Sequence, residues 1–306
     1  MKAAILSQKR TLYSTRRLIE ECKARSIEPV VLNPLRCDIL VSNNGHSLFY
    51  NKKRLNAVDV VIPRIGSSIT HYGLSVLRYF SEMGIPSVAE WSSIAVARDK
   101  FHSLQVLSAG GVQVPATIMI RNPANISKAI DRIGGVPVIV KLIRGTQGIG
   151  VIILESKQSA TSAVEALWQM GRHILIQEYI IESRGVDIRT IVVDGKVVAS
   201  CRRFARLGEF RSNIHQGAVG ELVELHPEYR EIAERAAHIL NLGVAGIDMV
   251  ESVKGIMILE VNASPGFEGI EKITHINVAG AIIDYAKRLV AHHHFQTERN
   301  CAHTER

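Results

Sequence analysis

The chain has 306 residues, of which 46% are hydrophobic and 22% charged, and its formal net charge is +8 at pH 7. This composition is typical of a globular protein and excludes a disordered or fibrous chain. No apolar run reaches the ~18 residues that a membrane-spanning helix needs. The N-terminal segment turns polar at Ser7, too early for a secretory signal. We therefore expect a cytoplasmic protein without a membrane partner.

The cysteine count and the charge narrow the class of protein further. Four cysteines lie far apart, without the spacing of a zinc site or a disulfide framework, and we expect reduced thiols. The basic balance favours an anionic partner such as a nucleotide, RNA or an acidic polypeptide, although a mildly basic surface explains it equally well. Aromatic residues make up only 5% of the chain. A direct nucleic-acid platform of stacked bases is therefore not supported.

The first part of the chain alternates between strand and helix patterns. Strands are predicted over 3–6, 29–32 and 58–62. Apolar residues at helical spacing around Leu18 and Cys22, and again over 72–83, predict two helices. This rhythm indicates a small open parallel sheet, although any α/β domain shows the same rhythm.

The second part begins with one amphipathic helix, predicted over 95–109 and ended by two glycines. The elements that follow are predicted as strand 117–120, helix 126–133, strands 136–142 and 151–154, helix 160–170 and strand 173–177.

The last part reads as an antiparallel and then mixed unit. Asp194-Gly195, a favoured turn pair, joins predicted strands 188–193 and 196–200 into a hairpin. After it we expect helix 227–240, strands 246–251 and 256–261, helix 279–291 and a polar, frayed tail.

The segment from Gly145 to Gly150 is rich in glycine and follows a strand that carries Lys141. It is not a Walker A loop, because Val151 and Ile152 stand where Lys and Ser or Thr are required. It also lacks the third glycine of a dinucleotide-binding loop. Glycines allow backbone N–H groups to approach phosphate, and the lysine would add a point charge. A tight hairpin with a solvated lysine is an equally good interpretation.

Three oxygen-bearing side chains interrupt two apolar strands near the C-terminus. Glu260 and Asn262 are two residues apart and therefore share one strand face, and Asp248 interrupts the preceding strand. Burial of carboxylates is unfavourable without a compensating cation, and such oxygen donors suit Mg²⁺ together with substrate phosphates. The alternative is a solvent-facing strand edge.

Arginines form the third pattern, at Arg189, at Arg202-Arg203 and at Arg211. Separated arginines suit a polyanionic ligand, with a solvated basic face as the alternative, which we favour for Arg202. No triad of nucleophile, base and acid is recognisable. The run of three histidines from His292 receives no catalytic role.

Taken together, these residues resemble the RimK family of the ATP-grasp ligases over about residues 1–290. The strings that carry the resemblance are Gly145-Thr-Gln-Gly-Ile-Gly150, Gln177-Glu-Tyr179, Asp187-Ile-Arg189, Phe210-Arg-Ser-Asn213, Gly246-Ile-Asp248 and Glu260-Val-Asn-Ala-Ser-Pro-Gly266, with Lys141. Pro63-Arg-Ile-Gly66, Ala97-Arg-Asp-Lys100 and Phe267-Glu-Gly-Ile-Glu-Lys272 also look similar to that family.

The resemblance implies an α/β fold of the ATP-grasp type. It implies a parallel-sheet pre-ATP-grasp domain over 1–95, a central lid domain over 96–175, a C-terminal metal and acceptor domain over 176–290, and a flexible tail over 291–306.

The resemblance also implies a role for each site residue. Lys100 and Lys141 would neutralise ATP phosphates, and Asp248, Glu260 and Asn262 would hold two Mg²⁺ or Mn²⁺ ions. Arg203 and Arg189 would stabilise charge that develops in the reaction. The remaining ATP-binding residues would be Gln177, Glu178 and Tyr179 at the adenine, Asp187 at the ribose, and Arg211, Ser212 and Asn213 at the phosphate or acyl end. The lid loop would comprise Gly145, Thr146, Gln147, Gly148 and Gly150.

The implied activity is ligation of glutamate to the C-terminus of a small-subunit ribosomal protein through an acyl phosphate, with ATP consumed. The implied partners are therefore that protein tail and free L-glutamate, and the implied assembly is a homo-oligomer. Cys201 stands where the family pattern has an acidic residue, beside the expected acceptor site. Ligation to a small-molecule carboxylate is one alternative function, and a nucleotide-responsive ribosome-binding protein is another.

Overall fold

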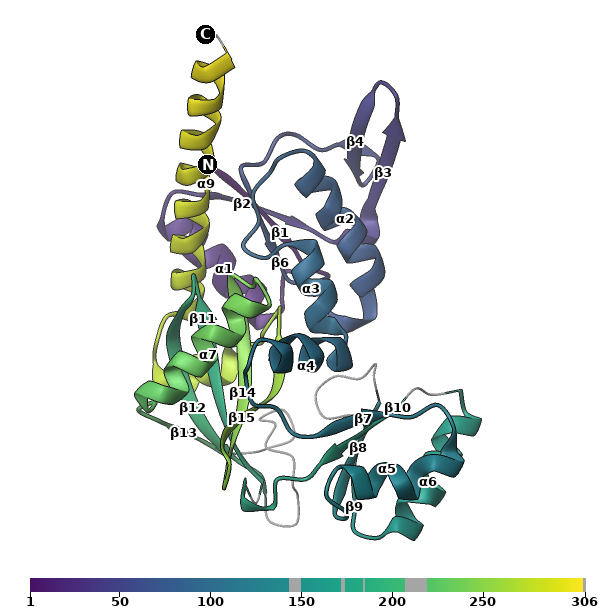
Figure 1. Ribbon diagram of the computed structural model, residues 1–306. Helices are drawn as coiled ribbons and strands as arrows, with labels where there is room; N and C mark the ends of the chain where they lie inside the picture. The colour runs from purple at the N-terminus through teal and green to yellow at the C-terminus, as the bar shows by residue number, and fades with distance from the viewer. Residues whose placement is uncertain (143–149, 172–173, 184, 207–218, 305–306) are drawn as a thin grey trace.

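The computed structural model describes residues 1–142, 150–171, 174–183, 185–206 and 219–304, with side chains in the last helix as far as residue 296 (Figure 1). Residues 145–148 and 211–213, for which the sequence predicts roles, lie outside the described residues. None of the helices in the described ranges combines the length and the apolar character needed to cross a membrane.

The N-terminal unit is built on a parallel sheet with the strand order β2-β1-β6, which confirms the open parallel sheet predicted from the sequence. Strands β1 and β6 are almost fully buried, whereas β2 is buried only at its C-terminal end. The elements are β1 (Lys2–Leu6), α1 (Tyr13–Ala24), β2 (Glu28–Leu32), β6 (Val60–Pro63) and α2 (Thr70–Glu82), with short 3₁₀ turns η1 (Pro34–Arg36) and η2 (Ser67–Ile69).

A small antiparallel sheet that the sequence analysis did not predict lies between β2 and β6. It contains β3 (Cys37–Ser42), β4 (Gly45–Tyr50) and β5 (Lys53–Arg54), and it projects from the body of the molecule (Figure 1). Its residues are largely exposed, so they lack the strong apolar alternation from which strands are predicted.

The single helix predicted over 95–109 is wrong: the chain forms two helices, α3 (Trp91–Arg98) and α4 (Lys100–Ala109). Asp99 separates them. Its backbone is extended, and its carboxylate accepts hydrogen bonds from the N–H groups of Phe101 and His102. An aspartate in this position satisfies N–H groups that would otherwise be unpaired at a helix start. As a consequence, Lys100 is the first residue of α4.

The central unit is an antiparallel sheet with the order β7-β10-β8-β9, covered on one face by two helices. Alternate residues of β8 point to opposite faces: Val138 and Val140 pack under the helices, whereas Ile139 and Lys141 face a cavity. The elements are β7 (Thr117–Met119), η3 (Pro123–Asn125), α5 (Ile126–Arg132), β8 (Val138–Leu142), β9 (Val151–Leu154), α6 (Lys157–Gln169) and β10 (Ile174–Glu178).

The C-terminal unit is a five-stranded antiparallel sheet with the order β13-β12-β11-β14-β15. Asp194 and Gly195 have φ values of 52° and 70°, as the turn predicted between β11 and β12 requires. The elements are η4 (Ile181–Ser183), β11 (Val186–Val193), β12 (Lys196–Phe204), β13 (Val219–Leu222), α7 (Pro227–Ile239), β14 (Val244–Ser252), β15 (Gly255–Asn262), α8 (Glu268–Thr274) and α9 (Val278–Thr304).

Helix α9 is longer than the sequence predicts. The pattern places its end near residue 291, where the apolar positions stop, but the helix continues to Thr304 and extends beyond the N-terminal sheet (Figure 1). Backbone hydrogen bonds alone can continue a helix past its apolar stripe, so the stripe marks only the part that packs against the body.

The hydrophobic cores show which units are joined. Two core clusters combine residues of the N-terminal unit with residues of the five-stranded sheet, and one of them also includes α9. A third cluster contains only residues of the central unit. The N-terminal and C-terminal units therefore form one hydrophobic body, and the central unit carries a core of its own.

Candidate active site

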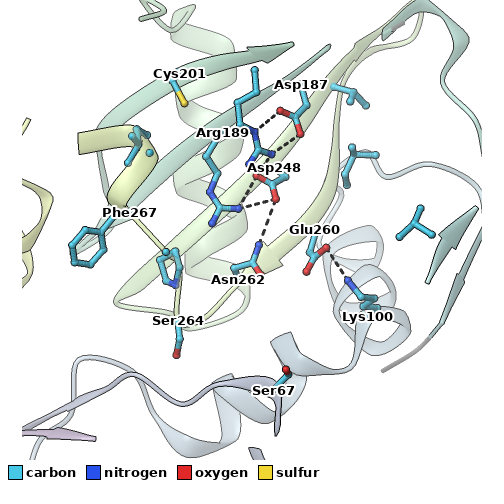
Figure 2. Close-up of a pocket in the computed structure, with 18 of the residues that line it drawn as sticks. Ser67, Lys100, Asp187, Arg189, Cys201, Asp248, Glu260, Asn262, Ser264 and Phe267 are labelled. Carbon is cyan, nitrogen blue, oxygen red and sulfur yellow. Dashed lines mark hydrogen bonds and ion pairs between the residues drawn. The ribbon is translucent and has the colours of Figure 1, made fainter. Parts of the chain in front are cut away.

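A cavity of about 830 Å³ lies where the three units meet, and each unit contributes to its lining. Figure 2 shows Asp187, Arg189 and Asp248 on the five-stranded sheet, Lys100 on α4, and Ser67 from the N-terminal unit on the opposite side. The end of the sheet that is nearest the cavity carries charged side chains. The same face further along the strands carries the apolar residues that pack on α8 and α9.

Four charged side chains form a continuous network on this sheet. Arg203 donates two hydrogen bonds to Asp187, at 2.7 and 2.5 Å, and one of 2.9 Å to Asp248. Arg189 donates to both oxygens of Asp248, at 2.8 and 2.7 Å. Register explains the arrangement, because Asp187 lies opposite Arg203 on β12 and Arg189 lies opposite Asp248 on β14. Directly opposed residues in a sheet have the closest side chains.

The network is electrostatically balanced, with two carboxylates and two guanidinium groups that are each less than 15% exposed. Burial by itself would raise the pKa of Asp248, but Arg189 and Arg203 outweigh that effect and hold the pKa below its ordinary value. Burial by itself would lower the pKa of Arg203, whereas Asp248 and Asp187 raise it above its ordinary value. Asp248 and Arg203 are therefore both charged at neutral pH.

Glu260 and Asn262 extend this network along β15. Glu260 is the register partner of Asp248, and it forms an ion pair of 2.8 Å with Lys100. The partners of Asn262 favour the amide orientation in which its nitrogen donates to Glu260 (3.2 Å) and its oxygen accepts from Arg189 (3.1 Å). The structure thus brings Asp248, Glu260 and Asn262 together at one end of the cavity (Figure 2).

These three residues suit a divalent cation that prefers oxygen ligands. Two carboxylates and one amide supply only oxygen donors, as Mg²⁺ or Mn²⁺ prefers. Within the described ranges no group of three or more His, Cys, Asp and Glu side chains is placed to hold a metal ion. An ion at Asp248 and Glu260 would therefore need further oxygen ligands, which substrate phosphates can provide.

The two lysines approach the cavity from different elements. Lys141, on β8, donates a 2.6 Å hydrogen bond to Gln177 on the adjacent strand β10, and Gln177 donates in turn to Thr117. Burial and the neighbouring charge of Lys100 lower the pKa of Lys141 to about 8. Within the described residues the Lys141 ammonium forms no ion pair with a carboxylate, so it is well suited to bind an anion.

Glu178 and Tyr179 lie at the junction between the central and C-terminal units, and both line the cavity. The carboxylate of Glu178 is already engaged, because it accepts from the N–H group of Ala116 (3.1 Å) and forms an ion pair with Lys254 (3.2 Å). A ligand at this position would therefore meet backbone groups of the 178–179 segment more readily than the carboxylate of Glu178.

Two neighbouring residues of β12, Arg202 and Cys201, differ in exposure. Arg202 forms an ion pair with Glu251 at the surface, as its interpretation as a solvated basic residue predicts. Cys201 lines the cavity but is fully buried, and burial raises the pKa of its thiol to about 11. The thiolate, which is the reactive form, is therefore not populated at neutral pH.

Sequence reasoning missed several residues of the cavity wall, above all Arg64 and Arg98. Both fall in strings that the resemblance includes, but no charge pattern singles them out. The position of Arg64 could have identified it as a site residue, because it directly follows a fully buried parallel strand and ligands bind where such strands end. Gly150, the one residue of the predicted lid loop that the structure describes, has a φ of 77°.

Family models match nearly the whole chain. The model described as the RimK PreATP-grasp domain matches residues 1–94, and the model of the RimK-like ATP-grasp domain matches residues 97–286. A relative named "Probable alpha-L-glutamate ligase", from Maridesulfovibrio salexigens, is 46% identical over 288 residues, which are 94% of this chain and 96% of the relative.

Solved structures show the same fold. The ATP-grasp ligase PsnB, in complex with a phosphomimetic variant of its minimal precursor, Mg and ADP, aligns with a TM-score of 0.72 at 21% identity, covering 94% of this chain and 98% of that one. A RimK domain protein from Sphaerobacter thermophilus aligns with a TM-score of 0.72 at 22% identity, covering 94% and 99%.

Proposed function

Because this chain belongs to the RimK family of ATP-grasp ligases, we propose that it adds glutamate to the C-terminal carboxylate of a small-subunit ribosomal protein. The chain is an ATP-grasp ligase, and its relatives are named as α-L-glutamate ligases. The observation that supports a ligase site most directly is the convergence of Asp248, Glu260 and Asn262 with two lysines in one cavity.

The proposed reaction has two steps. An oxygen of the acceptor carboxylate attacks the γ-phosphorus of ATP, which forms an acyl phosphate and releases ADP. The amine of glutamate then attacks the acyl carbon, the new amide bond forms, and inorganic phosphate leaves with the electron pair of the broken C–O bond. Neither step requires a protein nucleophile.

The basic residues of the cavity divide this work. Lys141 and Lys100 balance the negative charge of the phosphates. Lys141 forms no ion pair with a carboxylate in the described part of the chain, so its charge is available. Lys100 would exchange its ion pair with Glu260 for contacts with the phosphates. Arg203 and Arg189 are held rigidly by Asp187 and Asp248, so they can stabilise oxygen charge that develops in both steps without reorganising. Asp187 orients Arg203 and, in our proposal, also borders the ribose.

Asp248, Glu260 and Asn262 would hold the divalent ions. A bound pair of Mg²⁺ or Mn²⁺ ions would neutralise the β- and γ-phosphates and supply Lewis-acid polarisation. Glu178 and Tyr179 would border the adenine, and residues 145–148 and 211–213 would complete the ATP site. We also propose a homo-oligomer that works in the cytoplasm.

Mass spectrometry tests the proposed acceptor. Small-subunit ribosomal proteins are incubated with the enzyme, ATP, Mg²⁺ and L-glutamate, and one of them is expected to gain glutamyl residues at its C-terminus. An Asp248→Asn variant serves as the control and is expected to leave the mass unchanged. If no ribosomal protein gains mass but a free carboxylic acid is converted with ADP release, the acceptor is a small molecule and the proposal is wrong.

A further inference from the structure

Two further arginines, on elements outside the five-stranded sheet, form a second basic wall of the cavity. Arg64 follows directly after β6, and Arg98 ends α3. Arg64 donates to the carbonyl oxygen of Pro265 (2.6 Å) and to the hydroxyl of Ser14 (3.2 Å). Arg98 donates to the carbonyl oxygen of Ile65. Figure 2 shows Ser67, which lies three residues after Arg64, on the side of the cavity opposite Asp187.

Arg64 and Arg98 differ from Arg189 and Arg203, which form ion pairs with aspartates. Neither Arg64 nor Arg98 forms an ion pair with a carboxylate in the described part of the chain, and the Nε atom of each is buried without a hydrogen-bond partner there. Burial and the charge of Arg98 lower the pKa of Arg64 to about 10, so its guanidinium remains charged at neutral pH. Glu260 lies near enough to Arg98 to offset part of the lowering of its pKa by burial, but Glu260 forms its ion pair with Lys100. Two partly buried guanidinium groups that have no ion pair of their own among the described residues favour a bound anion.

The start of α1 adds donors to the same wall. Residues 12–15 line the cavity, and Leu12 at the N-cap provides no side-chain hydrogen bond to the helix start. The first turn contains no acidic residue. Among the described residues, two carboxylates lie near this helix start: Glu271 already accepts from Tyr13, Arg17 and the N–H group of Ala279, and Glu268 forms an ion pair with Lys272. The N-terminus of this 12-residue helix has no side-chain cap and lies beside Arg64, which donates to Ser14, and such an environment favours a carboxylate.

We propose that Arg64, Arg98 and the start of α1 bind a carboxylate of the incoming glutamate. This inference rests on the proposed function, which requires two carboxylate-bearing substrates in one cavity. The reacting carboxylate of the acceptor must lie at the phosphates, near Asp248 and Glu260. The amine of glutamate must also reach that point, so its own carboxylates have to be held elsewhere. Arg64 and Arg98 line the same cavity and form no ion pair within the described residues.

Hydroxylamine separates this role from the others. This small uncharged amine attacks the acyl phosphate, releases inorganic phosphate and gives a hydroxamate, and it needs no carboxylate site. Arg64→Gln and Arg98→Gln are expected to raise the KM for glutamate at least about tenfold, the loss of one charge-assisted hydrogen bond. The KM for ATP and the rate of hydroxamate formation should change less than about twofold. Arg54→Gln, at an exposed position on β5, is the control and should change none of these values.

Calorimetric titration of L-glutamate into the enzyme with ADP and Mg²⁺ provides a readout that does not need an acceptor. The wild-type protein should bind glutamate, and both variants should bind it at least about tenfold more weakly. Glutamine or glutamic acid α-amide should bind weakly to the wild type, and the weaker of the two identifies the bound carboxylate.

Three results would overturn the proposal. They are wild-type-like glutamate affinity in both variants, an equal loss of hydroxamate formation and glutamate ligation, and a raised KM for the acceptor peptide alone. The two proposals can fail separately. If the wild type binds glutamate more tightly than the Arg64→Gln variant but modifies no ribosomal protein, the proposed acceptor is contradicted and the carboxylate site remains supported.

Discussion

Asp248 connects the two arginines of the charge network, because it accepts hydrogen bonds from both Arg189 and Arg203. It is also a proposed metal ligand, opposite Glu260 in the sheet. An Asp248→Asn substitution removes one negative charge from a buried set of four. We expect ADP release to fall by roughly 100-fold or more, since both metal binding and the orientation of the arginines depend on this carboxylate.

The same substitution also tests stability. Removal of one partner of a buried ion pair costs about 3 kcal/mol, which a denaturant titration can measure. Glu251→Gln, three residues further along β14 at the surface, is the matched control and should leave both values nearly unchanged. Normal ADP release by the Asp248→Asn variant would exclude Asp248 as a metal ligand.

The lowered pKa of Lys141 predicts that ATP binding depends on pH. Its pKa of about 8 means that the free enzyme loses this positive charge as the pH rises through that value. Only the protonated amine attracts phosphate, so the KM for ATP should be constant below about pH 7 and should rise about fivefold between pH 8 and pH 9.

A Lys141→Arg variant distinguishes this cause from others, because a guanidinium remains charged over the same range. Its KM for ATP should stay flat from pH 7 to pH 9, whatever its absolute value. A flat profile in the wild type would show that Lys141 does not bind phosphate through its charge.

At the scale of single elements, the break between α3 and α4 positions a functional side chain. Asp99 ends one helix and caps the next, and Lys100 therefore projects from the first turn of α4 toward Glu260. Asp99→Ala should lower the free energy of unfolding by about 1 kcal/mol and should also raise the KM for ATP, because Lys100 loses its fixed starting point.

Ser156→Ala is the corresponding control. Ser156 caps α6 in the central unit with a reciprocal hydrogen bond to Ser159, and it lies outside the cavity lining. It should lose a similar amount of stability, about 1 kcal/mol, without a change in the KM for ATP. If both variants change the KM equally, the cap of α4 has no special connection with Lys100.

At the scale of the whole molecule, the separate core of the central unit predicts local unfolding. Ile130 belongs only to that core, and Ile191 belongs to the core that joins the N-terminal and C-terminal units. Both side chains are fully buried, so replacement by alanine should cost about 2–5 kcal/mol in each case.

Amide hydrogen exchange can show where that loss appears. Ile130→Ala should increase exchange in β8 and β10 but leave β1 and β11 protected, whereas Ile191→Ala should increase exchange in β1 and β11 together. Increased exchange across the whole molecule in the Ile130→Ala variant would show that the central unit is not an independent folding unit.

The predictions that succeeded from sequence were those set by local pattern. Apolar strands, the turn at Asp194-Gly195 and the parallel N-terminal sheet follow from side-chain periodicity and backbone preference, which act over a few residues. The break at Asp99 was also local, but its helical surroundings concealed the cap. The strands β3 and β4 contain apolar runs at 39–41 and 48–50 but no regular alternation of apolar and polar residues, so periodicity did not identify them.

The sequence by itself determined that Asp248, Glu260 and Asn262 interrupt apolar strands. The strings that contain these residues also carry part of the family resemblance. Only the tertiary structure decided that Asp187 pairs with Arg203, that Lys100 meets Glu260, and that Arg64 and Arg98 form no ion pair in the described part of the chain. The physical reason is that these contacts join residues that are separated in the sequence, on neighbouring strands for Asp187 and Arg203 and on different units for Lys100 and Glu260. Whether a charge is compensated depends on which side chains the packing of those units places within hydrogen-bonding distance.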